Sequence, residues 1–332
     1  MDLTTNYMGF KLRNPLIVSS SSLTATFENI KKAIDFGAAG IVLKSLFEEE
    51  LRADSEKLMY QDDNYFWYPD AIDHVNKYSQ ERGVNEYLDL IKQVKDYAPD
   101  IPLFASVHCN TAQEWPKYAS MLEESGADAL ELNIYIFPFD RNLTSETIED
   151  KYIEIVKEVK KHTKLPIAVK MGYGFTNITR HTWRLQESGA NGLVIFNRFY
   201  RPDIDIDDEA VVRADVLSEP SEITQALRWV SLLSGDLDAD ICGSRGVHTA
   251  EGVIKMMMAG AKATQICSTL YNNGLGYIDT LLFDLEKWME KHFYNSISEF
   301  QGKISKASYN QKAFRKVQYS LSFFRAHLPS KS

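Results

Sequence analysis

Cysteine is scarce in this chain, with three residues among 332. Cys109, Cys242 and Cys267 show neither the close pairs of a metal site nor the spacing of a disulfide framework. The sequence therefore predicts no metal site and no iron–sulfur cluster of its own. So few cysteines also fit a reducing cytoplasm.

Long apolar runs and an excess of positive charge are missing as well. No apolar stretch is long enough to span a bilayer, and the first residues, MDLTTNYMGF, lack the basic and apolar regions of a signal peptide. The net charge of −9 argues against nucleic acid as the main partner, because phosphate binding needs a basic field. We therefore expect a cytoplasmic protein without membrane insertion that acts on a small molecule.

What the sequence does contain is a short repeat, a Gly-Ala pair followed after two variable residues by an apolar run. The four copies are FGAAGIVLK, SGADALELN, SGANGLVIF and AGAKATQIC. Each copy follows a segment with the periodicity of an amphipathic helix. The glycine is expected at the helix C-terminus with a positive φ, and the apolar run is expected as a strand buried on both faces.

Four further apolar runs, NPLIVSS, IPLFASV, LPIAVKM and DADICGS, alternate with these copies. The two sets together predict eight strands, and a helical segment follows almost every one. The strands are expected to begin near Pro15, Gly40, Pro102, Asp128, Pro166, Gly192, Asp238 and Ala263. This alternation predicts an α/β fold, a (β/α)8 TIM barrel, as a single domain over residues 1–332. A doubly wound sheet with appended pieces is the alternative.

Three segments do not fit the alternation. Residues 47–84 and 198–220 are predicted as long loop insertions after the second and sixth strands, on the C-terminal face where barrels keep their active sites. The basic and aromatic segment 295–332 is predicted as a C-terminal extension that forms a surface helix or a dimer contact. A docking site for an acidic partner is the alternative for this extension.

Polar residues stand at the expected ends of four strands. Lys44 ends the second strand, Asn133 the fourth, Lys170 the fifth and Asn197 the sixth. Burying a lysine without a partner is costly, so two lysines and two asparagines on one rim indicate a functional site. A structural ion pair is the alternative for either lysine.

The last two strands run into turns of small residues. Loops in these positions frequently bind phosphate through backbone N–H groups and a helix N-terminus. The residues expected there are Gly243, Ser244, Arg245, Gly246, Cys267, Ser268 and Thr269. His248 is expected to cap the next helix. A phosphate at one end and lysines and asparagines elsewhere suggest flavin mononucleotide (FMN), with Lys170 stabilising the negative charge of the reduced flavin.

Together these motifs make the sequence resemble the dihydroorotate dehydrogenase family, in particular its soluble class-1 branch, over nearly the whole chain. The motifs are NPLIVSSSS with Ser19 and Ser20, IVLKS with Lys44, ELN with Asn133, AVKM with Lys170, VIFN with Asn197, ICGSRGV…AGAKATQICST, and FQGK near Gly302. The resemblance implies an FMN-bound, homodimeric barrel that oxidises dihydroorotate to orotate in pyrimidine biosynthesis. It places Ser19, Ser20, Lys44, Lys170 and Asn197 at the flavin, with Lys44, Asn133 and Asn197 also orienting the substrate.

The chain departs from the family after Glu-Leu-Asn. The resemblance implies a cysteine or serine there, which takes a proton from the substrate, and then Pro-Asn, whose asparagine holds the substrate. This chain instead reads IYIFP, and the aromatic insertion replaces the family's glycine-rich substrate loop. Tyr135 is the nearest candidate base, although a phenol with a pKa near 10 needs help at neutral pH. His74, Asp73, Asp140 and His108 are alternatives, each with a structural explanation at least as good.

Four functions are compatible with these patterns. The principal hypothesis is an FMN oxidoreductase acting on dihydroorotate or a close relative. The others are an FMN enzyme of the same fold with a different substrate and a more apolar site, a non-redox barrel that uses Lys170 as a Schiff-base lysine, and a flavin-binding protein without turnover. The electron acceptor is open among a fumarate-type acceptor, a quinone and an iron–sulfur partner subunit.

Overall fold

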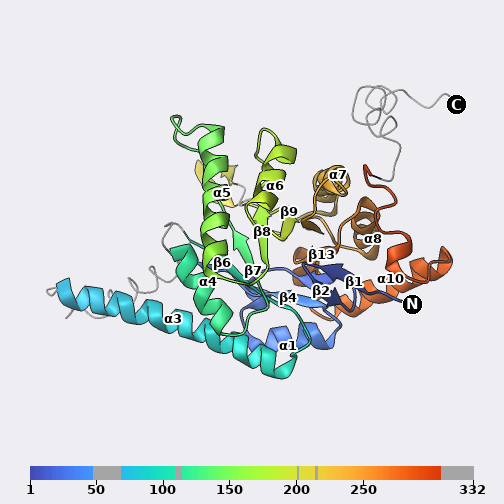
Figure 1. Ribbon diagram of the computed structural model, residues 1–332, viewed down its shortest axis with the longest axis horizontal. Coiled ribbons are helices and arrows are strands. Elements are labelled where there is room, and N and C mark those ends of the chain that lie inside the picture. The colour runs from blue at the N-terminus through green and yellow to red at the C-terminus, as the bar shows by residue number, and fades with distance from the viewer. Residues whose placement is uncertain (48–68, 110–113, 200–201, 214–215, 308–332) are drawn as a thin grey trace.

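The computed structural model describes residues 1–47, 69–109, 114–199, 202–213 and 216–307, and it contains a closed barrel of parallel strands surrounded by helices (Figure 1). In chain order the eight barrel strands are β3 (Leu16–Val18), β4 (Gly40–Val42), β6 (Leu103–His108), β7 (Ala129–Asn133), β8 (Ile167–Met171), β9 (Gly192–Ile195), β12 (Asp240–Gly243) and β13 (Ala263–Ile266). Each pairs with the next, and β13 pairs with β3, which closes the ring. The predicted (β/α)8 barrel is confirmed, and the doubly wound alternative is wrong.

Helices connect these strands over the outside of the barrel (Figure 1). They are α1 (Phe27–Asp35), α3 (Pro69–Tyr97), α4 (Glu114–Glu124), α5 (Ser145–His162), α6 (Ile178–Glu187), α7 (Ile223–Leu233), α8 (Ala250–Ala259), α9 (Ser268–Asn273) and α10 (Tyr277–Lys291), with short 3-10 turns η1 (Ser22–Thr24), η2 (Pro220–Glu222) and η3 (Ile297–Glu299). The glycines of the repeat, Gly37, Gly126, Gly189 and Gly260, all have positive φ, between +95° and +109°. The sequence prediction for these four positions is confirmed.

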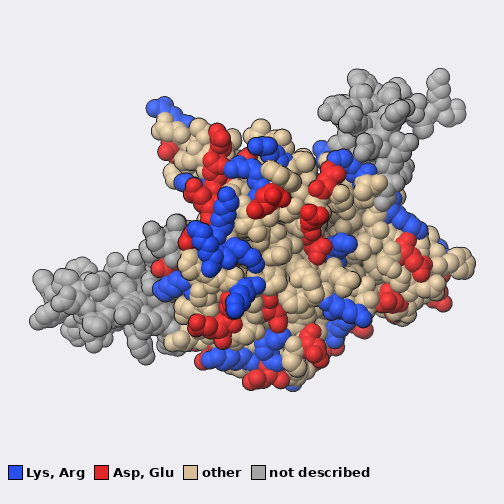
Figure 2. All heavy atoms as spheres, in the orientation of Figure 1, with Lys and Arg blue, Asp and Glu red and all other residues tan. Residues whose placement is uncertain are grey.

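Helix α5 illustrates how local sequence fixes a helix. The Thr144 side chain accepts a hydrogen bond from the Thr147 N–H at 3.1 Å and caps the N-terminus. Acidic side chains lie toward the start of the helix and basic ones toward its end, which complements the helix dipole (Figure 2). Its buried face presents Tyr152 and Val156 to the barrel.

An N-terminal hairpin closes one end of the barrel. Its strands are β1 (Thr5–Tyr7) and β2 (Phe10–Leu12), and Tyr7 packs in one buried cluster with interior residues of the barrel strands, among them Phe104. The Asp240 carboxylate, at the start of β12, accepts a hydrogen bond from the Met8 N–H at 2.7 Å. Because the hairpin covers the N-terminal ends of the strands, a ligand reaches the barrel from the C-terminal end.

Both segments predicted as loop insertions contain regular secondary structure. Residues 69–84 form the first part of α3, which continues to Tyr97 and projects beyond the barrel (Figure 1). Its later turns carry Ile91 and Val94, which are buried in the hydrophobic core and anchor the helix on the barrel. Residues 48–68 lie outside the described part of the chain. A short strand, β5 (Leu46–Phe47), precedes them and pairs with β6.

The segment 198–220 contains an antiparallel hairpin, β10 (Pro202–Asp205) and β11 (Ala210–Arg213), so it too is more ordered than a loop. Of the C-terminal extension, residues 295–307 are described. They bind the end of α8 through backbone hydrogen bonds from Gly302 to Met257 and from Ile304 to Met258, both 2.9 Å. The roles predicted for the rest of the tail fall outside the described residues. None of the described helices is both long and apolar enough to cross a membrane.

Helix α6 buries a histidine in an aromatic environment. The His181 ring is fully buried, stacks on Phe175 at 4.0 Å between ring centroids, and meets Tyr152 edge-on at 5.4 Å. Neither ring nitrogen has a hydrogen-bond partner among the described residues. Burial, with a smaller contribution from Arg184, lowers the pKa of His181 from 6.5 to about 4.

We expect this histidine to make the fold acid-sensitive. A pKa that is lower in the folded than in the unfolded state adds stability above pH 6.5, and that stability is lost as the pH falls toward 4. The shift corresponds to about 3 kcal/mol in the free energy of unfolding. Denaturant unfolding between pH 7 and 4 should show a smaller loss in the free energy of unfolding for His181→Phe than for the wild type. The matched control is His162→Phe, at an exposed histidine of α5, and an equal pH dependence in all three proteins would contradict the assignment.

Candidate functional site

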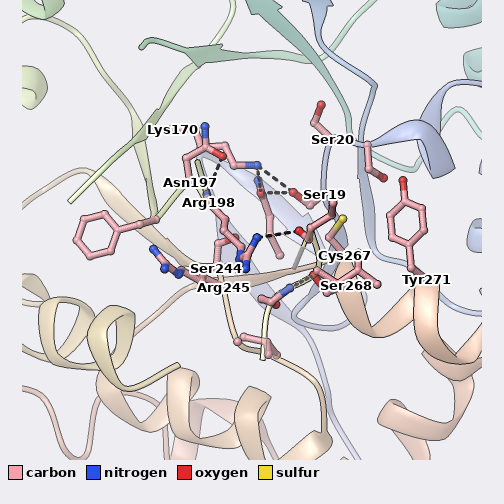
Figure 3. A pocket seen from close by; sticks show the side chains of 18 of the residues that line it. Ser19, Ser20, Lys170, Asn197, Arg198, Ser244, Arg245, Cys267, Ser268 and Tyr271 are labelled. Atoms are coloured by element: carbon pink, nitrogen blue, oxygen red, sulfur yellow. Dashed lines mark hydrogen bonds between the residues drawn. The ribbon is translucent and has the colours of Figure 1, made fainter. Parts of the chain in front are cut away.

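A cavity of about 800 Å³ opens at the C-terminal end of the barrel (Figure 3). The ends of five strands contribute residues that the sequence had singled out. These residues are Ser19, Ser20, Lys170, Asn197, Ser244, Arg245, Gly246, Cys267 and Ser268. Ten further residues line the cavity, among them Gln265, Arg198, Ser218 and Tyr271.

Lys170 places a fixed positive charge on one wall of this cavity. Its Nζ donates hydrogen bonds to Ser19 Oγ at 2.9 Å and Gln265 Oε1 at 3.1 Å (Figure 3). It also lies 3.5 Å from a carboxylate oxygen of Glu131, which is 1% exposed and accepts a hydrogen bond from Gln265 Nε2. Partners from three strands therefore hold the ammonium group, and the buried carboxylate offsets the cost of burying it.

Arg245 lines the same cavity as Lys170 and brings a second positive charge to it. Its Nε donates to Glu222 Oε2 at 2.7 Å, while its Nη1 is buried without a hydrogen-bond partner in the described part of the chain. Glu222 also pairs with Arg198 Nε at 3.3 Å. Burial acts to raise the pKa of Glu222, but the Glu219 N–H and the two arginines outweigh it, so the net shift is downward. A buried guanidinium with an unused donor is suited to bind an anion.

The backbone around Arg245 adds further donors. Arg245 and Gly246 both have positive φ, +77° and +71°, and the N–H groups of Gly246 and Ser268 have no acceptor among the described residues. Ser268, the first residue of α9, accepts a hydrogen bond at Oγ from the Ser218 N–H at 2.9 Å. N–H groups from two turns that line the same cavity, beside a guanidinium, make an anion cradle of the kind that binds phosphate.

Two of the residues expected at this cradle have other tasks. Gly243 does not line the cavity, and a Cβ atom there would lie 2.8 Å from Met256 Sδ, so this glycine lets β12 pack on α8. His248 does not cap α8, contrary to the prediction, because Thr249 does so by accepting a hydrogen bond from the Gly252 N–H. The His248 ring lies 3.0 Å from Ser218 Oγ instead.

Gly246 is expected to be intolerant of any side chain. A Cβ atom there would lie 2.2 Å from the backbone nitrogen of Ile223, in addition to the strain of its positive φ. Gly246→Ala should lower the free energy of unfolding by about 3 kcal/mol or more. Gly126→Ala, at a positive φ with open space around it, should cost about 1–2 kcal/mol. Denaturant unfolding compares the two, and equal losses would show that the contact with Ile223 relaxes freely.

The remaining rim residues lie beside the main cavity. Lys44 lies two residues beyond β4, where its N–H donates to the Thr24 carbonyl at 3.3 Å, and it is not among the residues that line the cavity. Asn133 connects to the cavity through Asn197, whose Nδ2 donates to Asn133 Oδ1 at 2.8 Å. The two asparagines therefore form one polar unit between the ends of β7 and β9.

Tyr135 lies in a second cavity, of about 360 Å³. Its ring stacks on Phe199, with 4.1 Å between ring centroids. Burial raises the pKa of Tyr135, which leaves less phenolate at neutral pH. This environment suits a wall residue better than a proton acceptor.

The alternative bases are placed no better. His108 Nδ1 lies 2.7 Å from the Asn133 carbonyl oxygen, which fixes the ring against the backbone. Asp140 Oδ1 accepts a hydrogen bond from the Asn142 N–H in a surface turn. Asp73 and His74 fall in α3, in the part whose side chains lie outside the description. None of these geometries identifies a general base.

The fold and the site thus define a (β/α)8 barrel with a polar cavity at the C-terminal ends of its strands. A family model, "Dihydroorotate dehydrogenase", matches residues 2–289, and the chain belongs to the dihydroorotate dehydrogenase family, whose members are oxidoreductases acting on a CH–CH group. It is 27% identical over 309 residues to "Dihydroorotate dehydrogenase B (NAD(+)), catalytic subunit" of Thermoplasma volcanium, covering 91% of this chain and 98% of that protein.

Two further relatives show the range of the similarity. The protein of the same name from Pyrococcus abyssi is 26% identical over 306 residues, covering 90% of this chain and 98% of the relative. The "NAD-dependent dihydropyrimidine dehydrogenase subunit PreA" of Escherichia coli K12 is 23% identical over 323 residues, covering 91% of this chain and 76% of that protein. Relatives with differently named activities are therefore about equally distant from this chain.

Proposed function

We propose that this chain is an FMN-dependent oxidoreductase that removes hydrogen from a CH–CH bond of a small cyclic substrate. The single observation that carries the proposal is the pairing of Lys170 with the anion cradle in one cavity of about 800 Å³. FMN has a flat ring that gains negative charge on reduction and a phosphate at the end of a flexible chain. Both parts have a matching group in this cavity, and the volume is typical of a cofactor site.

The residues of the chain have separate tasks in this proposal. FMN, when bound, supplies the acceptor for the substrate hydride. Lys170 stabilises the charge of the reduced ring, because its position is fixed before the reaction. Arg245, Gly246 and Ser268 hold the phosphate. Asn133 and Asn197 bind the substrate as a hydrogen-bonded pair.

Dihydroorotate remains a candidate substrate, and so does a dihydropyrimidine without a carboxylate. The names of the Thermoplasma and Escherichia relatives support one each. The Schiff-base alternative is less well supported, because Lys170 Nζ donates two hydrogen bonds and faces Glu131, whereas that chemistry needs a free amine. The homodimer, the cytoplasmic location and the electron acceptor stay predictions.

The test is the visible absorption spectrum of the purified protein, followed by release of the ligand with acid and its identification by chromatography. We expect a flavin spectrum and FMN. Anaerobic addition of dihydroorotate or dihydrouracil then shows whether either substrate bleaches the flavin. A protein that carries no flavin and takes up none on incubation with FMN would contradict the proposal.

A further inference from the structure

Six of the fourteen residues that line the second cavity carry aromatic rings. It lies between the residues that follow β7, the residues that follow β8 and the first turns of α5. The rings that line it are Tyr135, Phe137, Tyr152, Tyr173, Phe175 and Phe199. Its volume of about 360 Å³ suits one small ring system.

The charges around this cavity disfavour an anion. Among the described residues that line it there is no lysine, arginine or histidine, and Glu149 is the one charged side chain. The Glu149 carboxylate lies 3.7 Å from Arg184 Nη1, outside the lining, so part of its charge is already compensated. A carboxylated ligand would bring a negative charge into an apolar space with no cation to meet it. An uncharged ring would meet mainly aromatic and aliphatic side chains there.

The aromatic cavity also lies next to the reactive end of the main cavity. Gly172, in its wall, is two residues from Lys170, and Tyr135 is two residues from Asn133. Phe199 covers Gly172 so closely that a Cβ atom at that glycine would lie 2.4 Å from the Phe199 ring. A molecule whose reacting bond lies near Lys170 could therefore extend its remote part into the aromatic cavity.

The two cavities adjoin at two aromatic rings. The Tyr173 ring lines the aromatic cavity and meets Phe196, which lines the main cavity, edge-on at 6.4 Å. The Arg245 guanidinium lies over the other part of this ring, 5.3 Å from its centroid. Because Tyr173 and Phe196 follow the ends of β8 and β9, the border between the cavities has a fixed place on the barrel.

We propose that the aromatic cavity is a substrate subsite that binds an uncharged aromatic or apolar ring. The substrate of this chain would then be larger and less polar than a carboxylated dihydropyrimidine. This inference rests on the proposed function, since the reacting part of the same molecule would lie at the flavin. It also gives a purpose to the sequence IYIFP, which supplies Tyr135 and Phe137 to the wall.

The experiment measures binding directly, with indole as the uncharged aromatic probe and orotate as the carboxylated one. Dissociation constants are determined by equilibrium dialysis on the FMN-loaded protein and on the flavin-free protein. We expect indole to bind at least tenfold more tightly than orotate. We expect Phe199→Ala to weaken the binding of indole at least tenfold. Phe293→Ala, at a ring that is 90% exposed, should leave the affinity for indole unchanged.

Phe199→Leu serves as a milder second variant, and thermal unfolding establishes that each variant is folded. Orotate binding more tightly than indole, or indole binding that is indifferent to both Phe199 substitutions, would overturn the subsite. The flavin content of each sample is read separately from its absorption spectrum. Indole bound by a protein that takes up no FMN would overturn the proposed function and with it the role of this cavity as a substrate subsite.

Discussion

Removing the charge of Lys170 is expected to slow flavin reduction by about 10²–10³-fold. The reason is that Lys170 is held before the reaction where negative charge develops, so no rearrangement is needed to stabilise it. The same loss should make the midpoint potential of the bound FMN more negative by tens of millivolts, since about 30 mV corresponds to 1.4 kcal/mol for two electrons. Spectroelectrochemical titration measures this shift without requiring the natural substrate.

The choice of variant matters because of Glu131. Lys170→Met alone would leave this 1% exposed carboxylate without its cation, and a buried unpaired charge costs about 3–5 kcal/mol of stability. The double variant Lys170→Met with Glu131→Gln removes both charges and keeps the shape of the network. Lys164→Met, at an exposed lysine before β8, is the control. A double variant whose flavin keeps the potential found in Glu131→Gln alone would remove Lys170 from the flavin site.

The barrel could be predicted from the sequence because its signals are local. The Gly-Ala repeat marks each helix end through a positive φ that glycine adopts without strain, and the apolar run beside it marks a strand buried on both faces. Counting these units gave the strands in the correct order. The limits of α3 were not predicted, because its N-terminal part projects beyond the barrel (Figure 1) and its composition resembles that of a loop.

The residues of the candidate site that end a strand could be predicted, whereas the contacts between residues of different strands could not. Ser19, Lys170 and Ser268 were found because each follows or ends an apolar run. Glu131 and Gln265 were missed, although each precedes a predicted site residue by two positions and so points to the same face of its strand. Their hydrogen bond joins residues 134 positions apart in the chain, and no periodicity within one strand reports such a contact.

The anion cradle illustrates the same limit at the other end of the cavity. Arg245 was predicted from its glycine-flanked turn, whereas Glu222, which orients its guanidinium, comes from a 3-10 turn that precedes α7. The sequence near Glu222 has no motif that points to the cavity. Only the closure of the barrel brings Glu222 between Arg198 and Arg245. Its carboxylate binds Arg245 at Nε, and Arg245 Nη1 keeps no hydrogen-bond partner among the described residues.

Loss of the Arg245 guanidinium should therefore weaken the binding of FMN and leave the binding of riboflavin, which has no phosphate, unchanged. A charge-assisted hydrogen bond contributes about 1.5–3 kcal/mol, so we expect the dissociation constant of FMN to rise about 10- to 100-fold in Arg245→Asn. Asparagine is the chosen replacement because it tolerates the φ of +77° at this position better than alanine. Fluorescence titration of the flavin-free protein with each flavin gives the two constants.

The comparison between the two flavins makes this prediction specific. A general disturbance of the cavity would weaken both ligands alike, whereas a lost phosphate contact weakens FMN alone. Arg228→Asn, at an exposed arginine of α7, should bind both flavins as the wild type does. Equal weakening of FMN and riboflavin in Arg245→Asn would place the phosphate elsewhere, and Arg245 would then serve only to hold Glu222 and the Tyr173 ring.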